Sequence, residues 1–207
     1  MAPETPPHRP EVEWDYGPVR ADAIAQGCLL VADPTMSDPN FRRTVVFVLH
    51  HGDEGTLGVV LNRPSEVPVD EVAPDWAAFV SDTGEAFIGG PVEQDTPLCL
   101  AALRNGETSS SVPGTIAVSG PVALVVLDSD PDELVSKVRG MRVFLGYAGW
   151  DAGQLEGELE REDWIVVPAL PSDVFAEPGT DLWARVLRRQ GVPTALLATH
   201  PGDLQLN

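Results

Sequence analysis

One group of polar residues in this chain has the side chains needed to bind an anion or polarise a carbonyl. Arg43, His51 and Asn62 stand at the ends of apolar, β-branched runs, and Arg63 follows Asn62 directly. A guanidinium presents a planar fork of donors that matches a carboxylate or phosphate, and a neighbouring amide or imidazole adds hydrogen bonds. Arg43 near Asn62 and His51 would therefore make a pocket for a carboxylate or phosphate group.

These residues also have a structural interpretation. Asn62 can bond the backbone of the turn that ends its strand, and Arg63 can pair with a carboxylate. The sequence leaves both interpretations open.

Two further segments combine glycine with aromatic or amide side chains. Gly89 and Gly90 permit a tight turn or close strand packing, and they also expose backbone N–H groups to an anion. Tyr147 and Trp150 are either core aromatics or part of a glycine-rich loop over a cleft, in which Gln154 presents its amide to a ligand instead of capping a helix. The full set of candidate ligand-binding residues is Arg43, His51, Asn62, Arg63, Gly89, Gly90, Tyr147, Trp150 and Gln154.

Several chemistries are excluded by what the sequence lacks. Its single lysine, Lys137, is predicted on the exposed side of a helix, and there is no phosphate-binding Gly-x-x-x-x-Gly-Lys loop or Gly-x-Ser-x-Gly nucleophile elbow. His50 and His51 are adjacent, so on a strand they point to opposite faces and would not chelate one ion together. We predict no metal site and no cofactor, and no pair of carboxylates can be singled out as catalytic.

The charge of the chain limits its partners. Thirty-two acidic residues against 13 Lys and Arg give a formal net charge of −19 at pH 7. Because a DNA-binding surface must place several cations near phosphates, this balance argues against direct binding to nucleic acid, and also against anionic membranes. No apolar run approaches the roughly 18 to 20 residues of a membrane span, and no signal peptide is visible. We expect a cytoplasmic protein.

Both cysteines lie in apolar runs and form no Cys-x-x-Cys pair. Cys28 belongs to CLLVA and Cys99 to LCLAAL, with no neighbouring histidine or cluster of cations to activate either thiol. We predict reduced, buried thiols.

The order of apolar runs predicts an α+β fold with a mixed sheet and peripheral helices. The segment 1–18 is rich in Pro and Glu and is predicted to be a mobile tail, followed by one compact domain over 19–207. Residues 24–32 predict a buried strand. Residues 44–50 and 57–62, separated by HGDEG, predict an antiparallel hairpin.

Further strands are predicted in six segments. They are AFIGG, PLCLAAL, TIAVSG, VALVVL, MRVFLGYAGW and WIVVP, with MRVFLGYAGW running into a turn. A helix is predicted over 131–139, since Asp130 can cap it, Pro131 suits its first position and Gly140 lies beyond its end.

Three more helices are predicted from the spacing of apolar residues. A short one begins near Pro74, and a second follows Asp151 with Leu155 and Leu159 on one face. The third is DLWARVLRRQG, which Gly191 ends. Its arginines Arg185, Arg188 and Arg189 are expected to complement the helix dipole.

Three blocks of the sequence resemble the bacterial YqgE/AlgH family. The first is DPNFRRTVVFVLHHGDEGTLGVVLNRP at 38–64, preceded by GCLLVADPTM; the second is GGPV at 89–92; the third is GYAGWDAGQLEGE at 146–158, followed by Trp164 and Pro168. The resemblance covers nearly everything from Gly27 to about Gly191. One departure is Leu100-Ala101, where relatives commonly carry a Leu-His pair, so a role built on that histidine is absent here.

The resemblance implies an α+β fold with a barrel-like or bifurcated sheet surrounded by helices. It implies no reaction, because family members are mostly of unknown biochemical role and some carry the label of transcriptional regulator. We expect a module that binds a small molecule or a protein and acts indirectly in regulation, rather than an enzyme. The alternatives are a transcriptional regulator acting on DNA, an enzyme with a site around Arg43, His51 and Asn62, and a structural scaffold.

Overall fold

The computed structural model describes residues 24–80 and 84–200 of the 207-residue chain. In these residues the strands are β1 (Cys28–Ala32), β2 (Val45–Gly52), β3 (Gly55–Val60), β4 (Pro64–Pro68), β5 (Glu85–Ile88), β6 (Val92–Leu103), β7 (Thr115–Ser119), β8 (Val122–Val125), β9 (Val138–Asp151) and β10 (Trp164–Pro168). The helices are α1 (Val69–Val72), the 3₁₀ helix η2 (Pro74–Phe79), α2 (Pro131–Val135), α3 (Gln154–Glu160), α4 (Pro171–Val174), α5 (Leu182–Arg188) and α6 (Thr194–Leu197).

The strands form one sheet in the order β10-β1-β2-β3-β9-β6-β8-β7, with β4 and β5 off this path. Neighbouring strands are antiparallel except β5 and β9, which pair in parallel through Phe87 with Phe144 and Ile88 with Leu145. The hairpin of β2 and β3 is confirmed, with Phe47 opposite Val59. The predicted α+β class with a mixed sheet is likewise confirmed.

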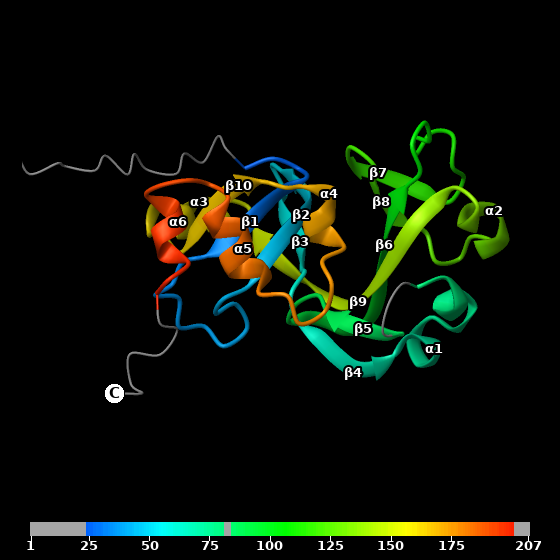
Figure 1. Ribbon diagram of the computed structural model, residues 1–207, viewed down its shortest axis with the longest axis horizontal. Helices are drawn as coiled ribbons and strands as arrows, with labels where there is room; N and C mark the ends of the chain where they lie inside the picture. Colours follow the sequence, from blue (N-terminus) through cyan, green and yellow to red (C-terminus); the bar gives the residue numbers. More distant parts are fainter. Residues whose placement is uncertain (1–23, 81–83, 201–207) are drawn as a thin grey trace, which may run out of the picture.

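The long strand β9 joins two lobes (Figure 1). Its end, from Ala148 to Asp151, pairs with β3, whereas its beginning and middle, from Val138 to Leu145, pair with β6. We call the part built from β10, β1, β2, β3 and helices α3 to α6 the β1 lobe. The part built from β4 to β8 with α1, η2 and α2 is the β6 lobe. The predicted tail at 1–18 lies outside the described residues.

The sheet divides where three glycines meet. Gly89 donates its N–H to the carbonyl of Leu145 at 2.8 Å and accepts from the N–H of Val60 at 2.7 Å, so the end of β5 inserts where β3 and β9 diverge. A Cβ on Gly89 would lie 2.2 Å from the carbonyl oxygen of Gly146, and one on Gly90 would lie 2.1 Å from the carbonyl carbon of Tyr147. Only glycine lets these backbones approach so closely. We call this place the glycine crossing.

The curled sheet returns towards its beginning. The side-chain amide of Gln26, just before β1, donates to the carbonyl of Leu49 in β2 at 2.9 Å and to that of Ala117 in β7 at 3.3 Å. The last strand of the β6 lobe therefore comes back to the first strands of the β1 lobe. Together with the division at the glycine crossing, this contact confirms the partly barrel-like, bifurcated sheet that the resemblance implied.

Buried apolar side chains form three clusters. One lies between the sheet and α5 and contains Phe47 and Trp183; the second, which holds Cys99, fills the β6 lobe. The third holds Trp150 and Trp164 with α3 packed over them. Cys28 and Cys99 are both free and buried, as predicted. No helix in the described part of the chain is long and apolar enough to cross a bilayer.

One predicted element is wrong in extent. The helix predicted over 131–139 ends at Val135, although Asp130 caps it as expected by accepting from the N–H of Asp132. From Val138 onward the backbone pairs with β6, opposite Leu103, so sheet hydrogen bonds replace the last helical turn. The strand predicted for MRVFLGYAGW is confirmed, because β9 continues as far as Asp151 and a turn at 152–153 follows it. GYAGW is therefore part of a strand and not a loop over a cleft.

Candidate functional site

The candidate residues of the first sequence block do not gather at one point. Asn62 joins the start of β2 to the end of β3, since its Oδ1 accepts from the N–H of Val45 at 2.9 Å and its Nδ2 donates to the carbonyl of Arg43 at 2.8 Å. Arg43 and Asn62 are therefore neighbours through the backbone of Arg43. Both hydrogen bonds hold the sheet together and use both ends of the amide.

The guanidinium of Arg43 points to α5. Its central carbon lies 4.1 Å from the ring centre of Trp183, Nη2 is 3.5 Å from a carboxylate oxygen of Asp181, and Nη1 donates to the carbonyl of His200 at 3.3 Å. Arg63 donates to the carbonyl of Pro39 at 2.7 Å. Partial burial lowers the pKa of the Arg63 guanidinium, with opposing contributions from Asp38 and Arg42.

His51 lies at the other end of β2. Its Nδ1 is 2.7 Å from the hydroxyl of Thr56 across the hairpin. Arg43 and His51 are eight positions apart, which corresponds to roughly 25 Å of strand. Arg43, His51 and Asn62 thus do not form one pocket.

Residues of all three sequence blocks meet instead in a cleft of about 360 Å³ beside α3. The first block, with the segment just before it, contributes Met36, Asp38 and Phe41; the second contributes Pro91; the third contributes Gly149, Trp150 and Gln154, followed by Trp164. We call this the motif cleft. Of the nine candidate residues, Trp150 and Gln154 line it directly.

Two buried indoles form the wall of the motif cleft. The ring centres of Trp150 and Trp164 lie 5.8 Å apart at 81°, and Phe41 packs against both at 5.9 and 5.4 Å. Phe41 stacks on Trp150, and the other two contacts are edge-on; both kinds of contact add to the stabilisation from burial of the rings themselves. These aromatics belong to the third core cluster, so Trp150 serves the fold as well as the cleft.

A half-buried carboxylate, that of Glu158, organises the polar side of the motif cleft. Its Oε2 accepts from the indole Nε1 of Trp150 and from that of Trp164, both at 2.8 Å. Its Oε1 accepts from Nε2 of Gln154 at 3.0 Å, and Oε1 of Gln154 accepts from the N–H of Asp151 at 3.1 Å. Gln154 therefore holds the turn before α3 and also Glu158. It does not cap α3 as the structural interpretation predicted, because the N-cap is Gly153, which has no side-chain hydrogen bond.

The other charged groups of the motif cleft are mostly acidic. Asp38 and Asp163 line it, together with one cation, Arg161. Arg161 lies 2.9 Å from Asp163 and donates to the carbonyl of Gly157 at 3.0 Å. With Glu158 included, carboxylates outnumber cations at the cleft by three to one.

A second hollow of about 390 Å³ adjoins the motif cleft and shares Gly149 and Trp150 with it. Tyr147, Val92 and His50 line this hollow. Tyr147 is thus close to the cleft without lining it, on β9 and not on a loop. Gly89 and Gly90 serve the glycine crossing, where their backbones are packed against β9.

Three charged residues with structural importance were not identified from the sequence. Glu158 is one; a carboxylate one helical turn after Gln154, on the side of α3 towards Trp150, was the available signal. Arg142 and Asp173 are the others, each almost completely buried. Asp173 also accepts from the N–H of Leu170 three residues earlier, at 2.8 Å, which is a local contact. The arginine partners of Asp173 and the carbonyls that Arg142 contacts all lie more than ten residues away along the chain, so the sequence gives no signal for them.

Sequence and structure together place the chain in a known family. It belongs to the family described as AlgH-like, whose model matches residues 29–195. A UPF0301 protein of Mycolicibacterium vanbaalenii is 52% identical over 199 residues, which is 96% of this chain and 99% of that protein. A UPF0301 protein of Mycobacterium tuberculosis is 51% identical over 193 residues, covering 93% of this chain and 96% of the relative.

Two solved structures share the fold. A crystal structure of a Corynebacterium diphtheriae protein matches with a TM-score of 0.81 and 39% identity, covering 85% of this chain and 92% of the other. The solution structure of the AlgH protein from Pseudomonas aeruginosa matches with a TM-score of 0.61 and 30% identity, covering 86% and 95%. These likenesses establish family and fold, and their names state no reaction.

Proposed function

We propose that this protein is a ligand-binding module of the cytoplasm, that the motif cleft is its binding site, and that its role in regulation is indirect. The observation that carries the proposal is the convergence of three sequence blocks, separated by some 25 to 55 residues, on one concave surface. Its volume is within the range of about 300 to 1,000 Å³ usual for small-molecule sites.

The chemistry of the cleft favours a ligand that donates hydrogen bonds or carries positive charge. Glu158 and Asp38 offer acceptor oxygens, while the guanidinium of Arg161 is engaged by Asp163. An anion would meet an excess of carboxylates there, whereas an ammonium or guanidinium group would be attracted to them and to the indole wall.

The two rival functions have less support. Direct action on DNA needs a surface that neutralises phosphates, and the chain has a net charge of −19. An enzyme built on Arg43, His51 and Asn62 needs these groups within reach of one substrate atom, whereas His51 lies at the far end of β2 from the other two.

The test uses a variant that adds a side chain at the rim shared by the motif cleft and the second hollow while sparing the fold. A Cβ on Gly149 would meet only the ring of Tyr147, at 3.5 Å, which is ordinary contact. Gly149→Val therefore places a β-branched residue on a strand at the rim of the cleft. Gly157→Ala on α3, whose added Cβ would be 3.9 Å from Arg161, is the matched control because it does not line the cleft.

Binding is measured in two ways. Native mass spectrometry of protein purified from its own host should show a retained species in the wild type and in Gly157→Ala, and not in Gly149→Val. NMR titration should shift the indole N–H signals of Trp150 and Trp164 with benzylammonium and much less with benzoate. The proposal fails if no species is retained and neither probe shifts these signals, or if Gly149→Val binds as the wild type does.

A further inference from the structure

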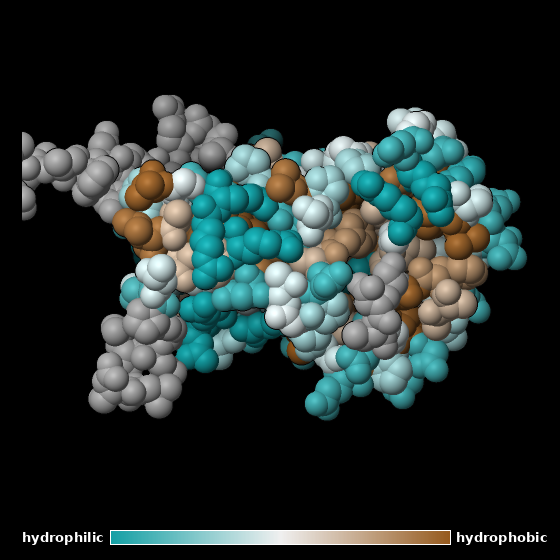
Figure 2. Space-filling view, in the orientation of Figure 1, coloured by the Kyte–Doolittle hydropathy of each residue, from teal (hydrophilic) through white to brown (hydrophobic). Residues whose placement is uncertain are grey.

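A second concave site, unrelated to the three sequence blocks, lies where the two lobes meet. This cleft of about 630 Å³ is lined by Ala102 of β6 and by Arg139 to Arg142 of β9 on one side. On the other side it is lined by Leu170, Phe175 and Glu177, which lie next to α4. We call it the interlobe cleft. Figure 2 shows tan and brown apolar surface in the region between the lobes.

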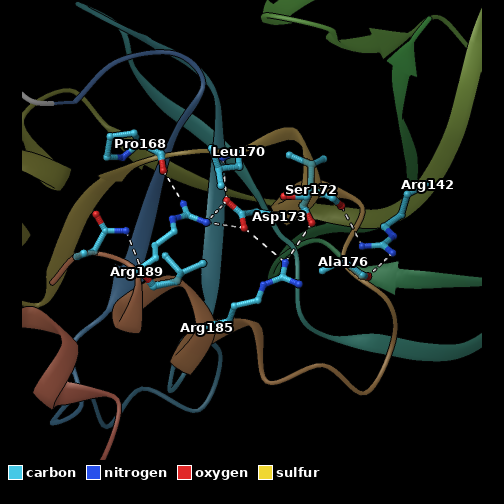
Figure 3. Close-up of polar contacts among 11 residues, drawn as sticks. Arg142, Pro168, Leu170, Ser172, Asp173, Ala176, Arg185 and Arg189 are labelled. Atoms are coloured by element: carbon cyan, nitrogen blue, oxygen red, sulfur yellow. Dashed lines mark hydrogen bonds and ion pairs between the residues drawn. The ribbon is translucent and has the colours of Figure 1, made fainter.

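The wall formed by 170–176 is held both from the β1 lobe and from β9 (Figure 3). From the β1 lobe, Arg189 binds both carboxylate oxygens of the buried Asp173 at 2.6 Å, and Arg185 lies 3.4 Å from one of them. From the part of β9 that pairs with β6, the guanidinium of Arg142 donates to the carbonyls of Val174 at 2.9 Å and Ala176 at 2.6 Å. The cleft is therefore preformed, and a ligand would not have to order it.

The lining pairs exposed apolar surface with positive charge. Leu170 is 48% exposed, one of a few large apolar side chains at the surface of the described residues. Arg139 is exposed on the facing strand, and its side chain makes no hydrogen bond or ion pair within 24–80 or 84–200. Arg142 adds a second guanidinium against one carboxylate, that of Glu177. In a chain with 13 Lys and Arg, this local excess of cations is unusual.

We propose that the interlobe cleft binds a small apolar carboxylate, with its carboxylate on Arg139 and its aliphatic or aromatic body between Leu170 and Phe175. A guanidinium without a partner is the group that gains most from a carboxylate. A large acidic partner would be repelled by the net charge of −19, whereas a small monoanion meets mainly the charges within a Debye length of about 8 Å. This site is independent of the motif cleft, which favours cations.

The probe is octanoate, compared with octylammonium and 1-octanol, titrated into the full chain by calorimetry and NMR. Arg139→Gln removes the charge that would bind the carboxylate, and Leu170→Ser removes an apolar contact with the body of the ligand. Arg188→Gln and Leu196→Ser are matched controls, because these residues are exposed and lie outside the cleft. We expect octanoate to bind the wild type more tightly than the other two probes, with an affinity that falls as salt is added.

Each cleft variant should weaken octanoate binding about fivefold or more, consistent with losing one charge pair or one apolar contact, and each control by less than about twofold. The proposal is overturned if octanoate does not bind at millimolar concentration or if octylammonium binds equally well. It is also overturned if Arg139→Gln and Leu170→Ser bind octanoate as the wild type does, or if the NMR shifts gather around Leu196 instead of Leu170.

Discussion

Two glycines of one motif, three residues apart on β9, have opposite surroundings. Gly146 adopts φ +69° at the glycine crossing, where an added Cβ would be 2.6 Å from the carbonyl oxygen of Val92. Gly149 is exposed at the rim of the motif cleft, where an added Cβ would meet only a ring at 3.5 Å. One glycine is required by the fold, whereas the other leaves space that the fold does not need.

The contrast between the glycine crossing and the motif cleft shows that one sequence block can hold both residues that the fold requires and residues that line a cleft. Gly89, Gly90 and Gly146 make the sheet divide, and Trp150 and Gln154 in the same blocks line a cleft. A family motif is therefore not by itself evidence for a site. Substitutions that separate the two requirements test this comparison directly.

The largest effect is expected at the glycine crossing. In Gly90→Ala the new Cβ would lie 2.1 to 2.4 Å from three backbone atoms of β9, so the strands must move apart. We expect a loss of about 4 kcal/mol or more in the free energy of unfolding, or failure to fold. Gly149→Ala should change it by less than about 1 kcal/mol. Urea denaturation measures both, and equal losses would abolish the distinction between crossing and cleft.

Much of the fold could be predicted because its signals are local. The hairpin of β2 and β3, the cap at Asp130 and the paired leucines of α3 are each set by residues a few positions apart. The end of the helix after Asp130 could not be predicted, since it depends on pairing between Val138 and Leu103 across the sheet. Such long-range hydrogen bonds override local helix signals.

The candidate site was predicted only in part. Trp150 and Gln154 line the motif cleft, yet Arg43, His51 and Asn62 do not form the expected pocket. Their side chains have the right chemistry, but His51 lies eight positions after Arg43, near the far end of β2. Whether these side chains meet depends on where each lies along its strand, and residue type alone does not predict that.

The next largest effect concerns a buried charge that serves the fold. Asp173→Asn keeps the shape of the side chain but leaves Arg189 without its carboxylate. Breaking a buried pair by removing one partner costs about 3 kcal/mol. Asp163→Asn is the control, because its partner Arg161 is mostly exposed, and it should cost less than about 1 kcal/mol. Thermal denaturation at low salt compares them, and a loss at Asp163 as large as that at Asp173 would contradict the assignment.

Glu158 both binds two buried indoles of the core and lines the motif cleft. We therefore expect its replacement to have an intermediate effect on the free energy of unfolding. Glu158→Gln leaves one oxygen to serve two indoles and an amide, and its own N–H₂ faces another donor in either orientation. We expect a loss of about 1 to 2 kcal/mol, with displaced indole N–H signals of Trp150 and Trp164. Glu160→Gln, at the exposed end of the same helix, should change neither. Unchanged indole signals in Glu158→Gln would contradict the hydrogen bonds from the two indoles to Glu158.

The smallest effect tests a group that serves the fold alone. Burial raises the pKa of the Cys99 thiol to about 12, whereas the unfolded thiol titrates near 8.5. Between these values the folded state holds a proton that the unfolded state has lost, so the stability from Cys99 is present at neutral pH and declines as pH rises. From pH 8 to 9.5 we expect a loss of about 1 kcal/mol through this thiol.

The contribution of Cys99 is isolated by comparing slopes of unfolding free energy against pH. Cys99→Ala should flatten the decline between pH 8 and 9.5, whatever its effect on stability at pH 7. Burial also raises the pKa of Cys28, but this side chain is less deeply enclosed, so Cys28→Ala should flatten the slope less. A slope in Cys99→Ala equal to that of the wild type would show that the thiol titrates alike in both states, contrary to its place in the core.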